Sequence, residues 1–183
     1  MIQNKTYKMV LTAFLATLGY VLNTFVSFPK MAPFQHFINV ISAVLLGPWG
    51  ALVCAFMTGS MRMILNGSTI LAIVGAIFGA FLSGLLYRRF KKLIWAVIGE
   101  MFGTGIISAI VSVPVMQFIG KLPSVPFYFY IPFFLPASAI GAVMGFVVMT
   151  ALIKTKCLNR LHLVAVPQES GTLRTAENNT KEK

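Results

Sequence analysis

Long apolar segments follow one another along most of this chain, separated by short polar connections. They cover residues 8–28, 36–66, 69–87, 93–119 and 132–153. A helix needs about 20 mostly apolar residues to cross the hydrocarbon core of a bilayer. The pattern therefore predicts an all-α integral membrane protein that passes several times through the cell membrane.

The segment 36–66 is long enough to cross twice, and the basic residues indicate that it does. They concentrate before the first segment, between the third and fourth, and after the last: Lys5, Lys8, Arg88, Arg89, Lys91, Lys92, Lys154, Lys156 and Arg160. Basic residues accumulate on the cytoplasmic side of membrane proteins. All three groups share one side only if the chain crosses an even number of times between Lys8 and Arg88, so 36–66 should fold back on itself.

Gly47 and Pro48 supply the place for this reversal. Glycine adopts the left-handed conformation that ends many helices, and proline suits the first position of a new helix. We therefore expect a bundle of six helices at about 8–28, 35–46, 48–65, 69–87, 93–119 and 132–153, with both termini cytoplasmic. Helix 35–46 is short for a crossing and should be buried among its neighbours. The membrane domain then covers 1–156, and the polar segment 157–183 should be a disordered cytoplasmic tail.

Small residues spaced four apart predict close helix packing within this bundle. They occur at Gly75, Gly79 and Ser83, at Gly99 and Gly103, and at Gly141 and Gly145. The first helix carries two similar pairs, which suggest a docking strip for another membrane protein instead: Thr12 with Ala16, and Ala13 with Thr17.

Composition and motifs exclude several classes of function. The chain is 57% hydrophobic and 10% charged, with mean hydropathy +0.84. Its net charge of +11 comes from basic residues at the ends of apolar segments. This position indicates that they orient the chain in the bilayer and do not bind nucleic acid. No nucleotide-binding or metalloprotease motif is present, and Cys54 and Cys157 have no metal-ligand spacing. Glu100 is the first acidic residue, and the next is Glu169, so paired catalytic carboxylates are missing. We expect no catalytic residues, no cofactor and no metal.

Polar residues inside the apolar segments gather at one predicted depth, near the outer ends of several helices. Gln35 and Asn39 are spaced i,i+4, as are Arg62 and Asn66, so each pair should project from one helix face. Aromatic residues precede the last segment. Together they suggest a small-molecule pocket, with a candidate binding set of Gln35, His36, Asn39, Arg62, Asn66 and Tyr128. An interfacial role is the alternative for Tyr128, His36 and Arg62.

Glu100 lies deeper, about 10 Å from the cytoplasmic end of its predicted helix, on a face shared with Thr104. A carboxyl group at that depth should be paired, protonated or functional. The sequence leaves two roles open for this pair, a structural hydrogen bond between helices or the floor of the pocket.

Several motifs in order resemble a known family. They are Phe34-Gln-His-Phe-Ile-Asn39, Leu45-Leu-Gly-Pro-Trp49, Ile73-Val-Gly-Ala-Ile-Phe-Gly-Ala80, Gly84-Leu-Leu-Tyr87 and Gly99-Glu-Met-Phe-Gly-Thr-Gly105. Between about Lys8 and Lys154 the chain resembles the substrate-binding S components of energy-coupling factor (ECF) vitamin transporters, and among them the ThiW type.

This resemblance implies a subunit that captures a vitamin precursor from outside and docks through its first helix on a transmembrane coupling subunit driven by two ATPases. The small docking strip of that helix is often Ala-x-x-x-Ala in the family, and here each pair contains one threonine. The ligand associated with the ThiW type is a thiamine precursor, 4-methyl-5-(2-hydroxyethyl)thiazole. Thiamine or its pyrimidine precursor are the alternatives within the class. A membrane scaffold protein and a gradient-driven carrier are the alternatives outside it.

Overall fold

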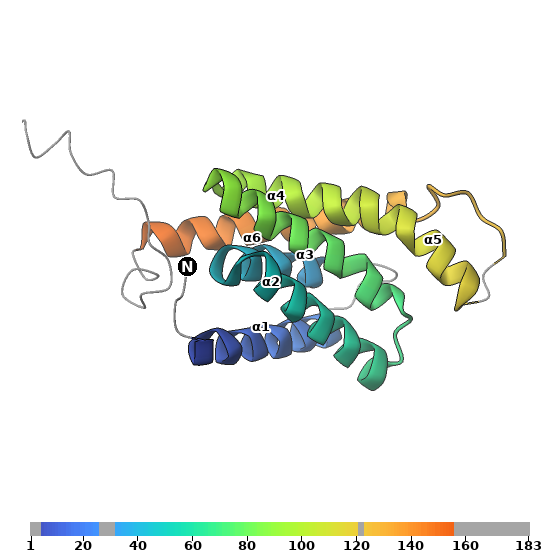
Figure 1. Ribbon diagram of the computed structural model, residues 1–183, viewed down its shortest axis with the longest axis horizontal. Helices are drawn as coiled ribbons and strands as arrows, with labels where there is room; N and C mark the ends of the chain where they lie inside the picture. The colour runs from blue at the N-terminus through green and yellow to red at the C-terminus, as the bar shows by residue number, and fades with distance from the viewer. Residues whose placement is uncertain (1–4, 26–31, 121–122, 156–183) are drawn as a thin grey trace, which may run out of the picture.

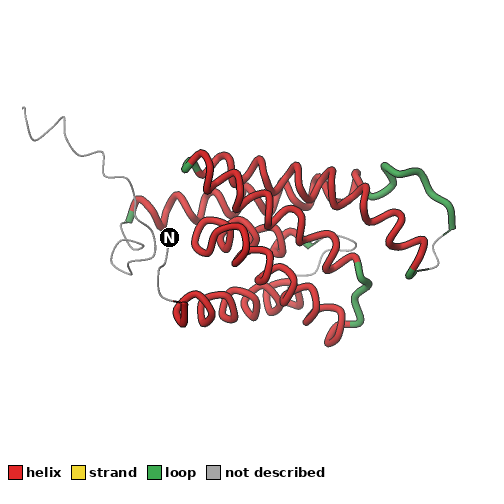
Figure 2. Tube along the Cα trace, in the orientation of Figure 1, coloured by secondary structure: helices red, strands yellow, loops and turns green. Residues whose placement is uncertain are grey.

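The computed structural model describes residues 5–25, 32–120 and 123–155, and every regular element in these ranges is helical (Figures 1 and 2). The predicted tail and the end of the predicted first helix lie outside them. Five helices are long and apolar enough to cross a membrane, so the prediction of an all-α membrane protein is confirmed. The elements are α1 (Lys5–Phe25), α2 (Pro33–Asn66), α3 (Leu71–Phe90), α4 (Leu93–Phe102), the π-helix η1 (Gly103–Ser108), α5 (Ala109–Phe118) and α6 (Ile131–Lys154). The elements α4, η1 and α5 form one continuous helical rod from residue 93 to residue 118.

The long helix α2 is interrupted at Gly47, whose backbone has φ 78° and ψ −174°. A positive φ of this size is open to glycine but costly for residues with a Cβ atom. Pro48 follows at the start of the second helical stretch. The chain therefore changes direction in the middle of α2, without a loop.

Contacts on either side of Gly47 show that the two halves of α2 run in opposite directions. In the first half, Pro33 lies against Gly141 and Val40 against Gly145, so this half runs parallel to α6. In the second half, Pro48 lies against Gly84, and Gly59 against Ala72, so this half runs antiparallel to α3. Since α3 and α6 run in the same direction (Figure 1), the two halves of α2 form an antiparallel pair.

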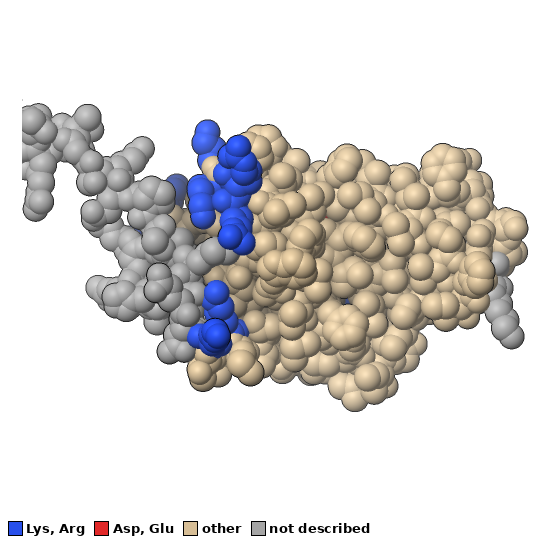
Figure 3. Space-filling model, in the orientation of Figure 1, with Lys and Arg blue, Asp and Glu red and all other residues tan. Residues whose placement is uncertain are grey.

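The described basic residues other than Arg62 gather at one end of the molecule (Figure 3). This is the end where α1 begins, α3 passes into α4, and α6 finishes (Figure 1). The residues that these element ends carry are Lys5, Lys8, Arg88, Arg89, Lys91, Lys92 and Lys154. The opposite end therefore holds the end of α1, both ends of α2, and the starts of α3 and α6.

The first half of α2 occupies the centre of the bundle. Every residue from 38 to 48 is buried, as expected for a helix too short to face lipid along its length. Its apolar side chains join a core cluster with Leu15 of α1, Val97 of α4 and Met149 of α6. Side chains on the outer faces of α1 and α6, such as Phe14 and Val147, are exposed.

Small residues bring the helix backbones together, which confirms the packing prediction. A Cβ added at Gly99 would lie 2.7 Å from the Cα atom of Ser83, and one at Gly103 would lie 2.7 Å from the Cα atom of Gly79. Both contacts join α3 to the rod formed by α4 and η1. These distances are far below ordinary van der Waals separation, so no larger residue fits without moving a helix.

The predicted docking strip on α1 is divided between two environments. Thr12 and Ala16 are buried, and the carbonyl oxygen of Ala16 accepts a hydrogen bond from Thr58 Oγ1 at 3.2 Å. Ala13 and Thr17 are exposed. Of the four residues predicted as a docking strip, Thr12 and Ala16 therefore pack within the chain, and Ala13 and Thr17 are open to a partner.

Candidate functional site

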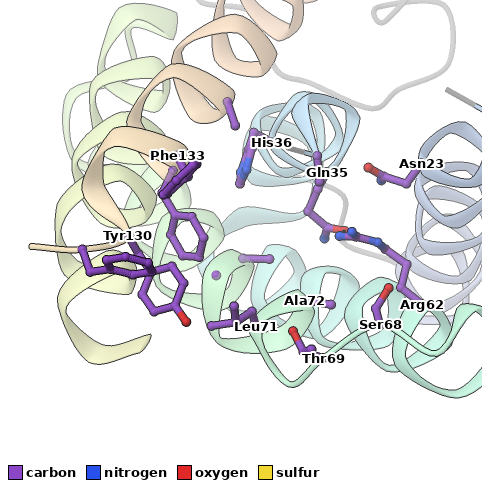
Figure 4. A pocket seen from close by; sticks show the side chains of 16 residues that line it. Asn23, Gln35, His36, Arg62, Ser68, Thr69, Leu71, Ala72, Tyr130 and Phe133 are labelled. Carbon is purple, nitrogen blue, oxygen red and sulfur yellow. The ribbon is translucent and has the colours of Figure 1, made fainter. Parts of the chain in front are cut away.

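A cavity of about 430 Å³ opens at the end of the bundle opposite the basic residues. It lies between the end of α1, both ends of α2, and the starts of α3 and α6, with the segment before α6 forming part of its wall (Figure 4). The reversal at Gly47 is what brings the two ends of α2 to the same cavity. Its lining residues are Asn23, Ala32, Gln35, His36, Arg62, Ser68, Thr69, Leu71, Ala72, Gly75, Ala76, Phe129, Tyr130, Phe133, Phe134 and Ala137.

One side of the cavity is polar and rich in hydrogen-bond donors. Gln35 and Arg62 point toward one another across the two ends of α2 (Figure 4), and Arg62 Nη1 lies 3.5 Å from Gln35 Oε1. Gln35 is 1% exposed, and its Nε2 atom has no hydrogen-bond partner among the residues that the structure describes. Among the described residues Arg62 has no carboxylate partner. This side therefore offers amide and guanidinium donors that a ligand acceptor can satisfy.

The other side of the cavity is aromatic. Tyr130 lies with its ring centroid 5.1 Å from that of Phe129 and 5.6 Å from that of Phe134. Gly75 of α3 leaves room for the Phe134 ring, since a Cβ there would lie 3.2 Å from two of its ring atoms. Such a wall can pack against a flat apolar ring.

Behind the cavity wall lies a fully buried carboxyl group, Glu100 of α4. Its Oε1 atom is 2.9 Å from His36 Nδ1, and it accepts hydrogen bonds from Asn39 Nδ2 and Thr104 Oγ1, each at 3.0 Å. Asn39 Nδ2 also donates to the carbonyl oxygen of Ala76 at 3.2 Å. The carboxyl group therefore links α2 to the α4–η1 rod, and Asn39 extends this network to α3 while His36 extends it to the cavity.

Gly79 of α3 makes this network possible. A Cβ atom at this position would collide with Thr104 Oγ1 and lie 2.9 Å from both carboxyl oxygens of Glu100. The π-helix begins at Gly103, just after Glu100, and π-bulges are frequent at functional sites. The helices thus leave a space shaped for a buried polar cluster.

The family model for the thiamine-precursor transporter protein (ThiW) matches residues 9–155. The chain belongs to the ThiW family. No curated protein and no solved structure matches the chain.

ThiW membership establishes a transporter in the membrane and not an enzyme, and it implies a small-molecule substrate. The resemblance drawn from the sequence motifs is confirmed at this level. The cavity is the natural place to seek the substrate site of this ThiW protein, because it combines an enclosed volume with convergent polar groups.

The predicted binding residues separate into three groups in this ThiW structure. Gln35, His36 and Arg62 line the cavity. Asn39 does not line it, and with Glu100 and Thr104 it forms the buried network behind His36. Asn66 and Tyr128 do not line the cavity and are exposed.

Asn66 turns toward α1 instead of the cavity. Its Nδ2 atom donates to Thr24 Oγ1 at 2.9 Å, and its Oδ1 atom accepts from Tyr20 OH at 3.0 Å. The i,i+4 spacing of Arg62 and Asn66 therefore does not bring both to the cavity.

Several lining residues are absent from the predicted set. Phe133 and Phe134 stand at the start of a long apolar helix, so the sequence shows them as ordinary membrane residues. Tyr130 lies two residues after Tyr128, and the aromatic run before α6 gives no way to choose between them. The polar residues Asn23, Ser68 and Thr69 carry a usable signal, since they sit near helix ends at the same predicted depth as Gln35.

Proposed function

We propose that this ThiW protein is the substrate-capture subunit of an ATP-driven ECF-type importer that binds 4-methyl-5-(2-hydroxyethyl)thiazole from outside the cell. The observation that carries the proposal is the cavity with one donor-rich side and one aromatic side at the end of the bundle away from the basic residues. The chain has no nucleotide-binding motif of its own. A coupling subunit and two ATPases would supply the energy.

The proposed topology has six crossings and places both termini in the cytoplasm. It is supported by the antiparallel halves of α2 and by the gathering of basic residues at one end. With that end in the cytoplasm, the cavity opens toward the outside. A subunit that captures its ligand externally needs this orientation.

The chemistry of the cavity favours a small neutral ligand with hydrogen-bond acceptors. Its volume is near the lower limit of about 300–1,000 Å³ for ligand pockets. Tyr130 and Phe134 supply a surface for a thiazole ring, while Gln35 Nε2 and Arg62 can donate to a ring nitrogen or a hydroxyl oxygen. No carboxylate is among the lining residues, which disfavours a cationic ligand such as intact thiamine.

Thermal unfolding of the purified protein with added ligands tests this proposal. Ligand that binds only the folded state raises the free energy of unfolding by RT ln(1 + [L]/Kd), about 2.7 kcal/mol at one hundred times Kd. We expect the thiazole alcohol to raise the unfolding midpoint more than thiamine or the pyrimidine precursor at equal concentration. No stabilisation by any of the three would support a scaffold, and uptake by vesicles holding this chain alone would support a gradient-driven carrier.

Replacement of Arg62 by methionine is expected to weaken binding of the thiazole alcohol by about ten- to one-hundredfold. Its guanidinium is the cationic donor of the cavity and has no carboxylate partner among the described residues, and hydrogen bonds from charged groups contribute about 1.5–3 kcal/mol. Isothermal titration would measure the change. Asn66→Ala is the matched control, because Asn66 lies one turn away but outside the cavity. Equal losses in the two variants would contradict this assignment.

A further inference from the structure

Glu100 is the one described carboxyl group, and it does not line the cavity. It is 0% exposed, whereas the His36 side chain in contact with it keeps 8% exposure and does line the cavity. Any effect of Glu100 on a ligand must therefore pass through a neighbour. His36 is the neighbour that reaches the ligand space.

The hydrogen bonds around Glu100 determine where the protons lie. Ala76 offers a carbonyl oxygen, which only accepts, so the Asn39 amide must direct its NH2 group toward Ala76 and Glu100. Thr104 donates to the same carboxyl oxygen. With these donors around Oε1, the carboxyl oxygen acts as an acceptor and His36 Nδ1 carries the hydrogen.

In a neutral imidazole with its hydrogen on Nδ1, the other nitrogen, Nε2, is a hydrogen-bond acceptor. Since Nδ1 is engaged by Glu100, Nε2 is the ring nitrogen that a ligand can use. The rest of the polar lining consists of the donors of Gln35 and Arg62, of hydroxyl groups that serve both ways, and of Asn23, whose Nδ2 donates to the Gly19 carbonyl oxygen and whose Oδ1 is an acceptor. An acceptor at His36 would give the cavity a group suited to a ligand O–H.

We propose that Glu100 is a positioning residue for ligand recognition: it holds His36 in the Nδ1–H tautomer, so that Nε2 accepts the hydrogen bond of the ligand hydroxyl group. This inference rests on the proposed function, in which the ligand is a thiazole alcohol. Glu100 itself does not touch the ligand. The neighbouring elements support this arrangement: Asn39 from α2 and Thr104 from η1 donate to the carboxyl group, and the Ala76 carbonyl oxygen of α3 fixes the Asn39 amide.

A double-mutant cycle separates this role from a merely structural one. Affinity for 4-methyl-5-(2-hydroxyethyl)thiazole is measured by isothermal titration in wild type, Glu100→Gln, His36→Ala and the double variant. We expect Glu100→Gln to weaken binding about fivefold when His36 is present, because a neutral amide accepts a weaker hydrogen bond than a carboxylate. In the His36→Ala background the same substitution should change affinity by less than about twofold.

The matched control is Ser112→Ala, which removes another buried polar group from the same helical rod. Ser112 is 0% exposed and does not line the cavity. We expect this variant to bind the thiazole alcohol with wild-type affinity. If Glu100→Gln weakened binding equally with and without His36, Glu100 would act on the fold and the proposal would be overturned.

Nitrogen-15 NMR of histidine tests the tautomer without any ligand. The His162→Asn variant leaves His36 as the only histidine of the chain, so its two ring nitrogens can be read alone. We expect a protonated Nδ1 and an unprotonated Nε2, and a shift of both resonances in Glu100→Gln. A protonated Nε2 would overturn the proposal.

The two tests distinguish the failure of this inference from that of the proposed function. A protein that the thiazole alcohol does not stabilise, but whose His36 has the Nδ1–H tautomer set by Glu100, would refute the proposed ligand and support the positioning role. A protein that binds the thiazole alcohol but shows additive losses of affinity in the cycle would support the proposed ligand and refute the positioning role of Glu100.

Discussion

Replacement of Gly141 by leucine is expected to destabilise the folded protein by about 3 kcal/mol or more. A Cβ atom at this position would collide with the carbonyl oxygen of Pro33 and lie 2.7 Å from His36 Cβ and 2.9 Å from the backbone nitrogen of Phe37. Inserting atoms into a packed core costs about 1–3 kcal/mol when side chains can adjust. Here two of the three obstacles belong to the backbone, so α6 must move away from α2.

Thermal unfolding in detergent would measure this loss, and Ala151→Leu is the matched control. Ala151 is exposed on the same helix, so the added side chain meets lipid or detergent instead of a helix. We expect the control to unfold within about 0.5 kcal/mol of wild type, as surface substitutions usually do. If Gly141→Leu unfolded like wild type, α2 and α6 would not be in backbone contact.

The smaller change Gly141→Ala introduces the same colliding Cβ atom without the rest of the leucine side chain, so it should destabilise the fold less. The contact with His36 Cβ places Gly141 directly behind a residue that lines the cavity. Displacement of α2 moves that ring, so in the proposed site this variant should also bind the ligand more weakly.

Much of this fold follows from elementary properties of the sequence. Segment lengths identify the membrane helices, the small residues mark their close contacts, and the parity of basic residues predicts a reversal near Gly47. Each property concerns position along the membrane normal or the volume of a side chain. Both can be read directly from the order of residues along the chain.

The sequence does not determine the rotation of each helix about its own axis. The differences between the predicted and observed site residues arise from this rotation. Arg62 and Asn66 share a predicted depth, yet Arg62 lines the cavity while Asn66 bonds to α1. In the same way Thr12 and Ala16 rotate inward and Ala13 and Thr17 outward. Apolar residues cover all sides of a membrane helix, so hydrophobic pattern gives little information about its rotation.

The contact between Glu100 and His36 depends on two helices whose sequences are far apart. The sequence predicts that Glu100 is paired, protonated or functional, because an isolated intramembrane carboxylate is costly. Several buried polar residues were available to it, and the choice of His36 and Asn39 follows from the antiparallel halves of α2 and from the gap at Gly79. The sequence could therefore predict that the Glu100 carboxyl group has a special environment, but not that His36 and Asn39 provide it.

Replacement of Ala13 by tryptophan is expected to abolish uptake by the assembled transporter while leaving ligand binding intact. Ala13 and Thr17 are exposed on α1, four residues apart, between large exposed side chains such as Val10 and Phe14. Small residues at this spacing let another membrane helix approach closely. In the proposed importer that helix belongs to the coupling subunit, and an indole at position 13 would hold it away. Co-purification with the coupling subunit and ATPases, together with uptake of the thiazole alcohol, would measure the loss.

The control for this substitution is Val147→Trp, which adds an indole to an exposed position of α6. It should assemble and transport normally, because the proposed interface with the coupling subunit lies on α1. Ala16 is unsuitable for the test, since it is 0% exposed and its carbonyl oxygen bonds to Thr58, so a larger residue there would report on folding. Titration with the thiazole alcohol separates the two steps: wild-type affinity in Ala13→Trp with no assembled complex would place the defect at docking. Normal assembly of Ala13→Trp would remove this face of α1 from the proposed interface.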